Sequence, residues 1–223
     1  MANYEVSPAL LERHVPYGTE LDIWNGVCYV SLVGFLFRNT RVRGIRVPWH
    51  TTFEEVNLRF YVRYRSDDEW RRGVVFIREI VPRRAIAEVA NRLYRENYRA
   101  MPMRHEWVES PDRLEVTYGW KLGRWHTLGV TAENRPVPIL PGSEEEFITE
   151  HYWGYAFWDD RTTNQYQVVH PRWEVYPVID YRVDLDPGLI YGEEWAGLTD
   201  REPTSIFLAE GSEVAVLAGE RVR

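Results

Sequence analysis

Lysine and cysteine are almost absent from this sequence of 223 residues, which contains one of each, Lys121 and Cys28. A single cysteine excludes an intramolecular disulfide and a cysteine-based zinc site, and its place in an apolar run predicts a buried side chain. Lysine and arginine together number 27, and all of these residues except Lys121 are arginines. Any imine chemistry on a side-chain amine therefore depends on Lys121.

A basic surface and a long apolar run are also missing. The net charge of -7 and the sequence pI near 5.5 argue against nucleic-acid binding, because neutralising phosphates requires clustered cations. The longest apolar stretch, residues 26–37, contains Ser31 and is too short for a membrane-spanning helix, so we expect no membrane partner. The polar and acidic first residues are unlike a signal peptide, and we expect a cytoplasmic protein.

Strand patterns dominate what is present. Hydrophobic residues make up 44% of the chain and aromatic residues 14%, which is enough for a sizeable core. Residues 26–37 are apolar on both alternating faces, which predicts a central strand covered on both sides. Residues 53–64 alternate sharply and are followed by the turn residues 66–69 and an apolar segment at 74–81, which predicts an antiparallel hairpin.

Helical patterns are fewer. An apolar stripe and the outward pair Glu88 and Arg92 predict a helix over residues 83–97. A capping-box pattern predicts a second helix over 144–151, and a Ser-Pro pair predicts a short N-terminal helix. Further strands are expected at 104–109, 114–120, 126–131, 155–158, 166–169, 173–184, 205–208 and 214–217. With no repeat or linker, residues 1–223 indicate a single α+β domain, mainly antiparallel β, whose large sheet curls or closes into a barrel.

One row of polar residues stands out within the predicted hairpin. Glu55, Asn57, Arg59 and Tyr61 alternate along one strand and therefore share one face. They form either a solvent face with cross-strand ion pairs or, if the aromatic-rich neighbours cover them, a hydrogen-bonded ladder. A covered ladder of this kind is a natural anchor for a ligand.

A second feature is the pair Arg83 and Arg84 at the start of the predicted helix. Cations are unfavourable there because the helix dipole is positive at its N-terminus. The two side chains either pair with Glu79 or Glu88 or simply extend into water. Alternatively, they join free helix N–H groups in a site for a carboxylate-bearing ligand.

Common catalytic and cofactor motifs are missing. The six histidines show no spacing typical of a metal site, and the chain has no Gly-x-Ser-x-Gly elbow, phosphate loop or dinucleotide fingerprint. We therefore expect no metal and no cofactor.

Several motifs in order resemble a known family. They are FEEVNLRFYV from residue 53, GVVFIREIVP from 73, ANRLYRENY from 90, EHYW from 150 and HPRW from 170. This succession resembles the uncharacterised YqjF-like family, which is grouped with the acetoacetate decarboxylase-like proteins, and the likeness extends roughly from residue 4 to 216. The resemblance implies a cone-shaped, mainly antiparallel β-barrel with a few helices and an internal pocket.

The decarboxylase chemistry does not carry over with that resemblance. Acetoacetate decarboxylases have Arg-Glu at the end of a strand and then Pro-Lys-Lys, whose first lysine forms the Schiff base. This chain has Arg78 and Glu79, and then Arg83 and Arg84 after the proline. Arginine stays protonated and cannot be that nucleophile, and Lys121 is expected at an exposed hairpin tip.

These observations lead to a hypothesis in which anion recognition is retained and imine formation is lost. Arg83, with Arg59 or Arg78, would hold a carboxylate or enolate, while Glu55 and Tyr61 supply acid-base or hydrogen-bonding groups. The roles of four further residues stay open between pocket and packing: Tyr94, Tyr98, His151 and His170.

Three functions follow from the sequence. The first is binding of a small anionic or carbonyl ligand, an organic acid or ketone, in a barrel pocket without Schiff-base decarboxylation. The second is a lyase, isomerase or hydrolase that uses Glu55 as base and arginines as electrostatic stabilisers. The third is a structural subunit that self-associates, and a homo-oligomer is compatible with any of them.

Overall fold

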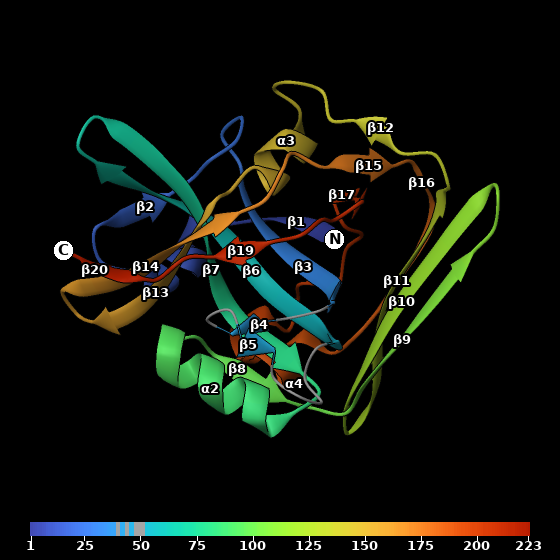
Figure 1. Ribbon diagram of the computed structural model, residues 1–223, viewed down its shortest axis with the longest axis horizontal. Coiled ribbons are helices and arrows are strands. Elements are labelled where there is room, and N and C mark those ends of the chain that lie inside the picture. The colour runs from blue at the N-terminus through green and yellow to red at the C-terminus, as the bar shows by residue number, and fades with distance from the viewer. Residues whose placement is uncertain (39–40, 43–44, 47–51) are drawn as a thin grey trace.

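The computed structural model describes residues 1–38, 41–42, 45–46 and 52–223 (Figure 1). Within these ranges the chain is mostly β, with short helices at the periphery. The helices are α1 Pro8–Leu11, α2 Arg84–Tyr94, α3 Glu144–Thr149 and α4 Pro187–Tyr191, with 3-10 turns η1 Glu12–His14 and η2 Glu193–Trp195. None of the helices in these ranges is long and apolar enough to cross a membrane.

The largest sheet has eleven strands in the described part of the chain, in the order β17-β1-β3-β6-β7-β13-β14-β19, with β2, β8 and β20 paired to β6, β7 and β14. Its strands are β1 Ala2–Val6, β2 Thr19–Leu21, β3 Cys28–Phe37, β6 Phe53–Ser66, β7 Glu69–Val81, β8 Tyr98–Ala100, β13 Trp153–Asp159, β14 Thr162–Val169, β17 Ser205–Ile206, β19 Ala215–Val216 and β20 Glu220–Val222. The predicted central strand is β3, which pairs with β1 and β6, and the predicted hairpin is β6 with β7.

Three smaller sheets complete the described structure. A four-stranded sheet, β16-β11-β10-β9, lies beside the large sheet (Figure 1). The strands of the smaller sheets are β9 Met103–Glu109, β10 Arg113–Leu122, β11 Arg124–Glu133, β16 Val178–Asp184, β12 Val137–Pro138, β15 Glu174–Tyr176, β18 Leu208–Ala209, β4 Arg41–Val42 and β5 Ile45–Arg46. The first of these sheets confirms the three strands predicted between residues 104 and 131.

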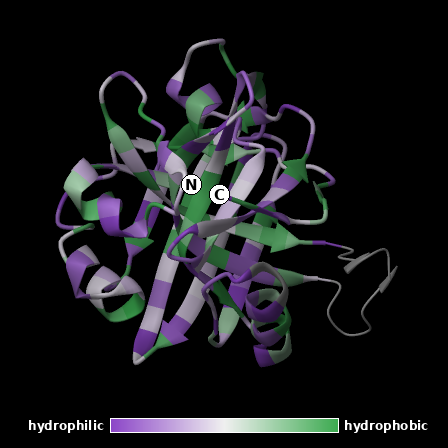
Figure 2. Cartoon of the chain, turned by 90° about the vertical axis from the view of Figure 1, so that its left-hand side faces the viewer, coloured by the Kyte–Doolittle hydropathy of each residue, from purple (hydrophilic) through white to green (hydrophobic). Residues whose placement is uncertain are grey.

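The main hydrophobic core lies between the large sheet and the four-stranded sheet. From β6 it receives Val56, Leu58, Phe60 and Val62, and from the opposite sheet Val116 and Trp120 among others. The Tyr118 ring of β10 packs so closely on Gly34 of β3 that a Cβ at Gly34 would collide with it. Figure 2 shows the apolar residues concentrated on the central strands and the polar residues on the outer helices and loops.

The second face of the large sheet is also covered, by smaller apolar groups at two places. At one end, Tyr61 packs against Phe147 of α3, with ring centroids 5.4 Å apart. At the other end, Phe53 and Val81 pack with Ala87 of α2. Between these two groups lies the polar row of β6.

Three expectations need correction. A closed barrel is not confirmed, because the strand order of each described sheet has two free ends. The strand expected over 173–184 is divided at Pro177, which has no N–H for a sheet hydrogen bond, into β15 and β16. The helix expected over 83–97 is shorter, because Arg95 takes the left-handed conformation that ends α2.

Candidate functional site

The polar row of β6 is buried rather than solvated. Glu55, Asn57 and Tyr61 are each about 1% exposed, so the solvent-face interpretation is wrong for these three residues. Asn57 lies opposite Glu79 of β7, and Glu79 lies opposite Tyr98 of β8, so these side chains form one rung across three strands. We call Glu55, Asn57, Arg59, Glu79 and Tyr98 the Glu55 cluster.

Hydrogen bonds connect the members of the Glu55 cluster. The Asn57 Nδ2 donates to Glu55 Oε1 over 3.0 Å, and the Tyr98 hydroxyl donates to Glu55 Oε2 over 3.1 Å. Tyr98 is itself fixed by Asn91 of α2, which accepts from its backbone N–H at 2.7 Å and donates to its carbonyl at 3.0 Å. Helix α2 therefore positions the hydroxyl that reaches Glu55.

A β-bulge in β7 places Glu79 in this cluster. The register changes between Leu58 and Arg59, so that Leu58 faces Arg78 while Arg59 faces Phe76, and Ile77 is the extra residue. Asn97 stabilises this irregularity by donating from Nδ2 to the Ile77 carbonyl over 2.7 Å. Because a bulge shifts the alternation by one residue, Glu79 turns to the polar face.

The same bulge removes Arg78 from the predicted site. Simple alternation from Arg59 and Phe76 would put Arg78 on the polar face, but it lies opposite Leu58, on the side of the main core. Its guanidinium donates to the Ile190 carbonyl of α4, and burial lowers its pKa. The structure therefore does not bring Arg78 together with Glu55.

Arg83 also lies outside the cluster. It occupies the N-cap position of α2 and is exposed, as is Arg84. Its side chain makes no capping hydrogen bond. Glu79, which the sequence offered as a partner for this arginine pair, is only 2% exposed and belongs to the buried rung instead.

Burial changes the proton affinity of the acidic side chains. It raises the pKa of Glu55 to about 7, although hydrogen bonds from Asn57 and Tyr98 act in the opposite direction. Burial also raises the pKa of Glu79 well above its usual range, and the neighbouring Glu96 and Glu55 carboxyls raise it further. At neutral pH these carboxyl groups are therefore partly protonated and are not all ionised at once.

Glu96 is held at the edge of the cluster by Tyr166 of β14, whose hydroxyl donates to Glu96 Oε1 over 2.8 Å. Burial raises the pKa of Glu96 to about 8. The Tyr166 ring lies over Gly154, the residue opposite it on β13, where a Cβ would collide with the ring. Glycine at that position thus allows Tyr166 to reach Glu96.

Arg59 is the cation closest to these acids along the row. Its Nη2 donates to the Ile148 carbonyl over 3.4 Å, and the guanidinium carbon lies 5.7 Å from the centre of the Tyr61 ring. The Tyr61 hydroxyl shares a 2.6 Å hydrogen bond with Ser31 of β3, which donates onward to Asn3. Tyr61 is therefore held by neighbours within the large sheet.

A buried histidine lies beside Tyr61. The ring of His151 is 4.6 Å from that of Tyr61, and its Nε2 is 3.0 Å from Asp22 Oδ2, which also accepts from Arg72 at 2.6 Å. Burial lowers the pKa of His151 to about 4, so the imidazole is neutral at physiological pH. Hydrogen bonds from His151 and Arg72 lower the pKa of Asp22, although burial acts in the opposite direction. An ionised carboxylate can only accept hydrogen bonds, so the proton between the two groups is on His151 Nε2.

Four polar atoms along this face are buried and have no hydrogen-bond partner: Asn57 Oδ1, Arg59 Nε, Glu79 Oε2 and His151 Nδ1. Buried polar atoms are nearly always hydrogen-bonded, and leaving one unpaired costs about 1–3 kcal/mol. These four atoms are therefore the unfavourable places on this face, where the described part of the chain supplies no hydrogen-bond partner.

Other residues singled out from the sequence lie elsewhere. His170 is on the surface, with its ring stacked 4.1 Å from that of Trp173. Lys121 is exposed near the β10–β11 turn, as expected. The Tyr94 side chain lies outside the described residues. In the described part of the chain, no group of three His, Cys, Asp or Glu side chains is arranged to hold a metal ion.

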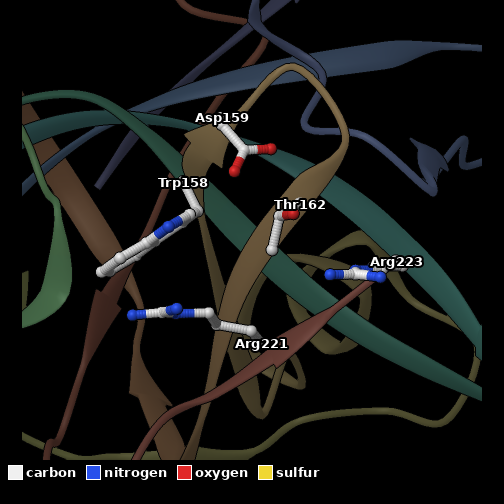
Figure 3. Close-up of a pocket in the computed structure, with 5 residues that line it drawn as sticks. All are labelled: Trp158, Asp159, Thr162, Arg221 and Arg223. Carbon is white, nitrogen blue, oxygen red and sulfur yellow. The ribbon is translucent and has the colours of Figure 1, made fainter.

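An open pocket of about 400 Å³ lies away from the Glu55 cluster, beside the β13–β14 hairpin and β20 (Figure 3). Its lining residues are Trp158, Asp159, Thr162, Arg221 and Arg223. The Arg221 guanidinium carbon is 3.6 Å from the centre of the Trp158 ring, and the Arg95 guanidinium carbon is 4.6 Å from it. The Trp158 ring of this pocket is thus contacted by two arginine guanidinium groups. The buried acids of the Glu55 cluster are not among its lining residues.

Comparison with solved structures supports the fold. Acetoacetate decarboxylase from Legionella pneumophila aligns with a TM-score of 0.58 at 12% identity, over 100% of this chain and 83% of that one. The enduracididine biosynthesis enzyme MppR, complexed with pyruvate, aligns with a TM-score of 0.60 at 12% identity, over 99% and 81%. At these identities the likeness establishes an acetoacetate decarboxylase-like fold and says nothing of activity.

Comparison with sequences identifies the family. The uncharacterized protein YqjF of Bacillus subtilis (strain 168) is 38% identical over 66 residues, which are 29% of this chain and only 27% of YqjF. The family model DUF2071, described as an uncharacterized conserved protein, matches residues 1–213. The chain therefore belongs to the DUF2071 family, and it has an acetoacetate decarboxylase-like fold.

Proposed function

We propose that the protein binds a small organic acid or ketone at the Glu55 cluster and does so without Schiff-base chemistry. The observation that carries the proposal is the set of buried, unpartnered polar atoms on the face of β6, above all Arg59 Nε and Asn57 Oδ1. A guanidinium beside neutral carboxyl groups is suited to a carboxylate or an enolate. Arg78 and Arg83 are left out of the site because of where they lie.

Electrostatics decides which form of the site receives an acid. With Glu55 ionised, a bound carboxylate would meet a negative charge beside Arg59, which already acts on Glu55. With Glu55 protonated, that repulsion is lost and the Glu55 O–H becomes an additional donor. Because the pKa of Glu55 is about 7, we expect an acidic ligand to bind more tightly as the pH falls through neutrality.

The absence of an imine step on a side-chain amine rests on the position of the one lysine. Lys121 is exposed beside the β10–β11 turn and makes no contact with the Glu55 cluster among the described residues. Sodium borohydride with acetoacetate should therefore leave the protein without a covalent adduct. A stable adduct on Lys121 would refute this part of the proposal.

The fold neighbours agree with a ligand of this size. One of them, MppR, is complexed with pyruvate in its solved structure, so this architecture accommodates a short keto acid. We also propose that the second face of the large sheet is enclosed by a curled part of the fold. In this arrangement α2, α3 and β8 lie around the polar row of β6.

A second candidate is proton-transfer catalysis by Glu55. A general base or acid works best when its pKa lies near the working pH, and the pKa of Glu55 is about 7. The raised pKa is the observation that supports a lyase, isomerase or hydrolase as the second candidate, with Arg59 stabilising the developing oxyanion. Glu55→Gln would separate the two, because it removes turnover and preserves most of the binding.

Binding can be tested by thermal shift and calorimetry with pyruvate and acetoacetate. Arg59→Met should weaken affinity by about 10-fold to 100-fold, as expected for a lost charge-assisted hydrogen bond. Arg84→Met is the matched control, because Arg84 is exposed on α2 and its replacement should leave the affinity unchanged. The proposal fails if no acid or ketone binds, or if the two variants behave alike.

A further inference from the structure

The four unpartnered atoms differ in what they need from a ligand. Arg59 Nε is always a donor and requires an acceptor. Asn57 uses its Nδ2 on Glu55, which leaves its Oδ1 as an acceptor. His151 donates from Nε2 to Asp22, so its Nδ1 is the lone-pair nitrogen of a neutral imidazole. The fourth atom, Glu79 Oε2, accepts a hydrogen bond when Glu79 is ionised and can carry a proton when it is not. Apart from Glu79, the face offers one unmet donor and two unmet acceptors.

These atoms follow an order along β6. Asn57, Arg59 and Tyr61 succeed one another on the same face, about 7 Å apart from one to the next. His151 contacts the Tyr61 ring, so the two acceptors lie on either side of the arginine. Both acceptor side chains are deeply buried, with Asn57 1% and His151 6% exposed.

A simple keto acid cannot satisfy such a face. The carboxylate and carbonyl oxygens of pyruvate are all acceptors, so they match Arg59 and leave Asn57 Oδ1 and His151 Nδ1 unpaired. A hydroxyl or amino group next to the carboxylate supplies the missing donor. Sites built to hydrogen-bond such a group reject analogues that lack it, because buried groups are then left unpaired.

We propose that the ligand is an organic acid with a hydrogen-bond donor on the carbon next to its carboxylate, a hydroxy acid or its amino counterpart, rather than a keto acid. The carboxylate accepts from Arg59, and the donor group is received by Asn57 Oδ1. This inference rests on the proposed function and specifies its ligand.

Calorimetry on the full chain with five three-carbon acids tests the assignment: propionate, pyruvate, lactate, glycerate and alanine. Lactate should bind about fivefold or more tightly than pyruvate and propionate, as expected for one added hydrogen bond. Glycerate should bind at least as tightly as lactate. Alanine that matches lactate would assign the donor to nitrogen as well as oxygen. Pyruvate or propionate binding as tightly as lactate and alanine would overturn the inference.

Variants connect this selectivity to Asn57. Asn57→Leu is nearly isosteric and should reduce lactate affinity to that of pyruvate, with pyruvate affinity itself little changed. Asn57→Asp keeps an acceptor oxygen and should keep the preference for lactate, and it is a second test if the leucine variant does not fold. Equal loss of lactate and pyruvate affinity in Asn57→Leu, or loss of the preference in Asn57→Asp, would contradict the assignment.

Failure of this inference can be distinguished from failure of the proposed function. If none of the five acids binds, or if Arg59→Met has no effect on those that do, the Glu55 cluster is not the binding site. If the acids bind through Arg59 but show no preference for a donor group, the site is right and the ligand class is wrong.

Discussion

The two faces of β6 are both buried, yet they are buried in different ways. On one face, Val56, Leu58, Phe60 and Val62 pack against the four-stranded sheet with no polar group to satisfy. On the other, Glu55, Asn57 and Tyr61 are as well shielded from solvent, but shorter elements shield them. One face is closed by a second sheet, and the other is covered at its two ends by α3 and α2.

This difference gives the two faces of a single strand different effects on stability. An apolar face contributes through the area that it removes from water. A buried polar face contributes little, because each group loses water and regains only a hydrogen bond. Unpaired atoms and raised carboxyl pKa values on the second face are unfavourable for folding, which is typical of a face retained for binding or chemistry.

The sharpest test compares neighbouring residues on opposite faces. Phe60→Ala should lower the free energy of unfolding by about 3–5 kcal/mol, because it opens a cavity in the main core. Tyr61→Phe removes only the hydroxyl bonded to Ser31 and should cost about 1 kcal/mol. Urea unfolding with an unchanged m-value measures both. Equal losses would mean that the two faces do not differ in this way.

The pH dependence of stability should reveal the acidic cluster. The pKa of Glu55 rises from 4.5 in its ordinary state to about 7 in the fold, so the folded chain holds a proton that the unfolded chain has released. Stability should therefore be complete below about pH 4.5 and decline as the pH rises to about 7, by on the order of 3 kcal/mol. Glu96 and Glu79 act in the same direction.

Urea unfolding between pH 5 and 8 measures this decline. Glu55→Gln carries no titrating proton and should flatten the curve, most visibly near pH 7. Glu20→Gln is a matched control, because Glu20 is exposed and pairs with Arg63 on the surface. A wild-type curve that rises over this range would contradict the placement of Glu55 in a buried cluster.

At the other end of the polar face, near His151, the contribution to stability should instead be lost at acidic pH. His151 has a folded pKa of about 4 against an ordinary 6.5, so its contribution is present above pH 6.5 and is lost as the pH falls towards 4. Asp22, whose pKa is lowered, extends this loss to lower pH. Asp22→Asn should cost about 2 kcal/mol at neutral pH, because it breaks the charged bond to Arg72.

The loss of stability in Asp22→Asn should thus be full at neutral pH and shrink as the pH falls and wild-type Asp22 becomes protonated. The difference between Glu55→Gln and wild type should instead grow as the pH rises through neutrality. Asp184→Asn is a suitable control, because that carboxylate pairs with Arg124 at the surface. If Asp22→Asn and Asp184→Asn have the same effect, the Asp22 and His151 pair has no special role in holding the second face.

Much of the fold could be predicted from local patterns. Alternation identified the β6–β7 hairpin and showed that Glu55, Asn57, Arg59 and Tyr61 share a face. The cap at Ser143 was also visible, and its side chain accepts from the Glu146 N–H as expected. These features depend on residues close in sequence, where period and capping chemistry act.

The remaining parts of the site depend on contacts that no local pattern records. Tyr166 meets Glu96 across 70 residues, and His151 meets Asp22 across 129. Glu79 was missed as a site residue because the bulge at Ile77 shifts the alternation of β7, which turns Glu79 instead of Arg78 to the polar face. The one residue that could have indicated the bulge is Asn97, whose side-chain amide donates to the Ile77 carbonyl. Its role can be recognised only when the pairing of the strands is known.

The smallest effect concerns the start of α2, which covers the second face near Phe53. Arg83 is the N-cap residue and makes no capping hydrogen bond. Arg83→Asp should raise the free energy of unfolding by about 1 kcal/mol, because aspartate caps the helix and suits the positive end of its dipole. Arg83→Ala, which removes the cation without adding a cap, should gain less.

The outcome for ligand binding is equally informative, because Arg83 is exposed and neither substitution should change the affinity for an organic acid. A marked loss of affinity would return Arg83 to the binding site and move that site from the face of β6 to the end of α2.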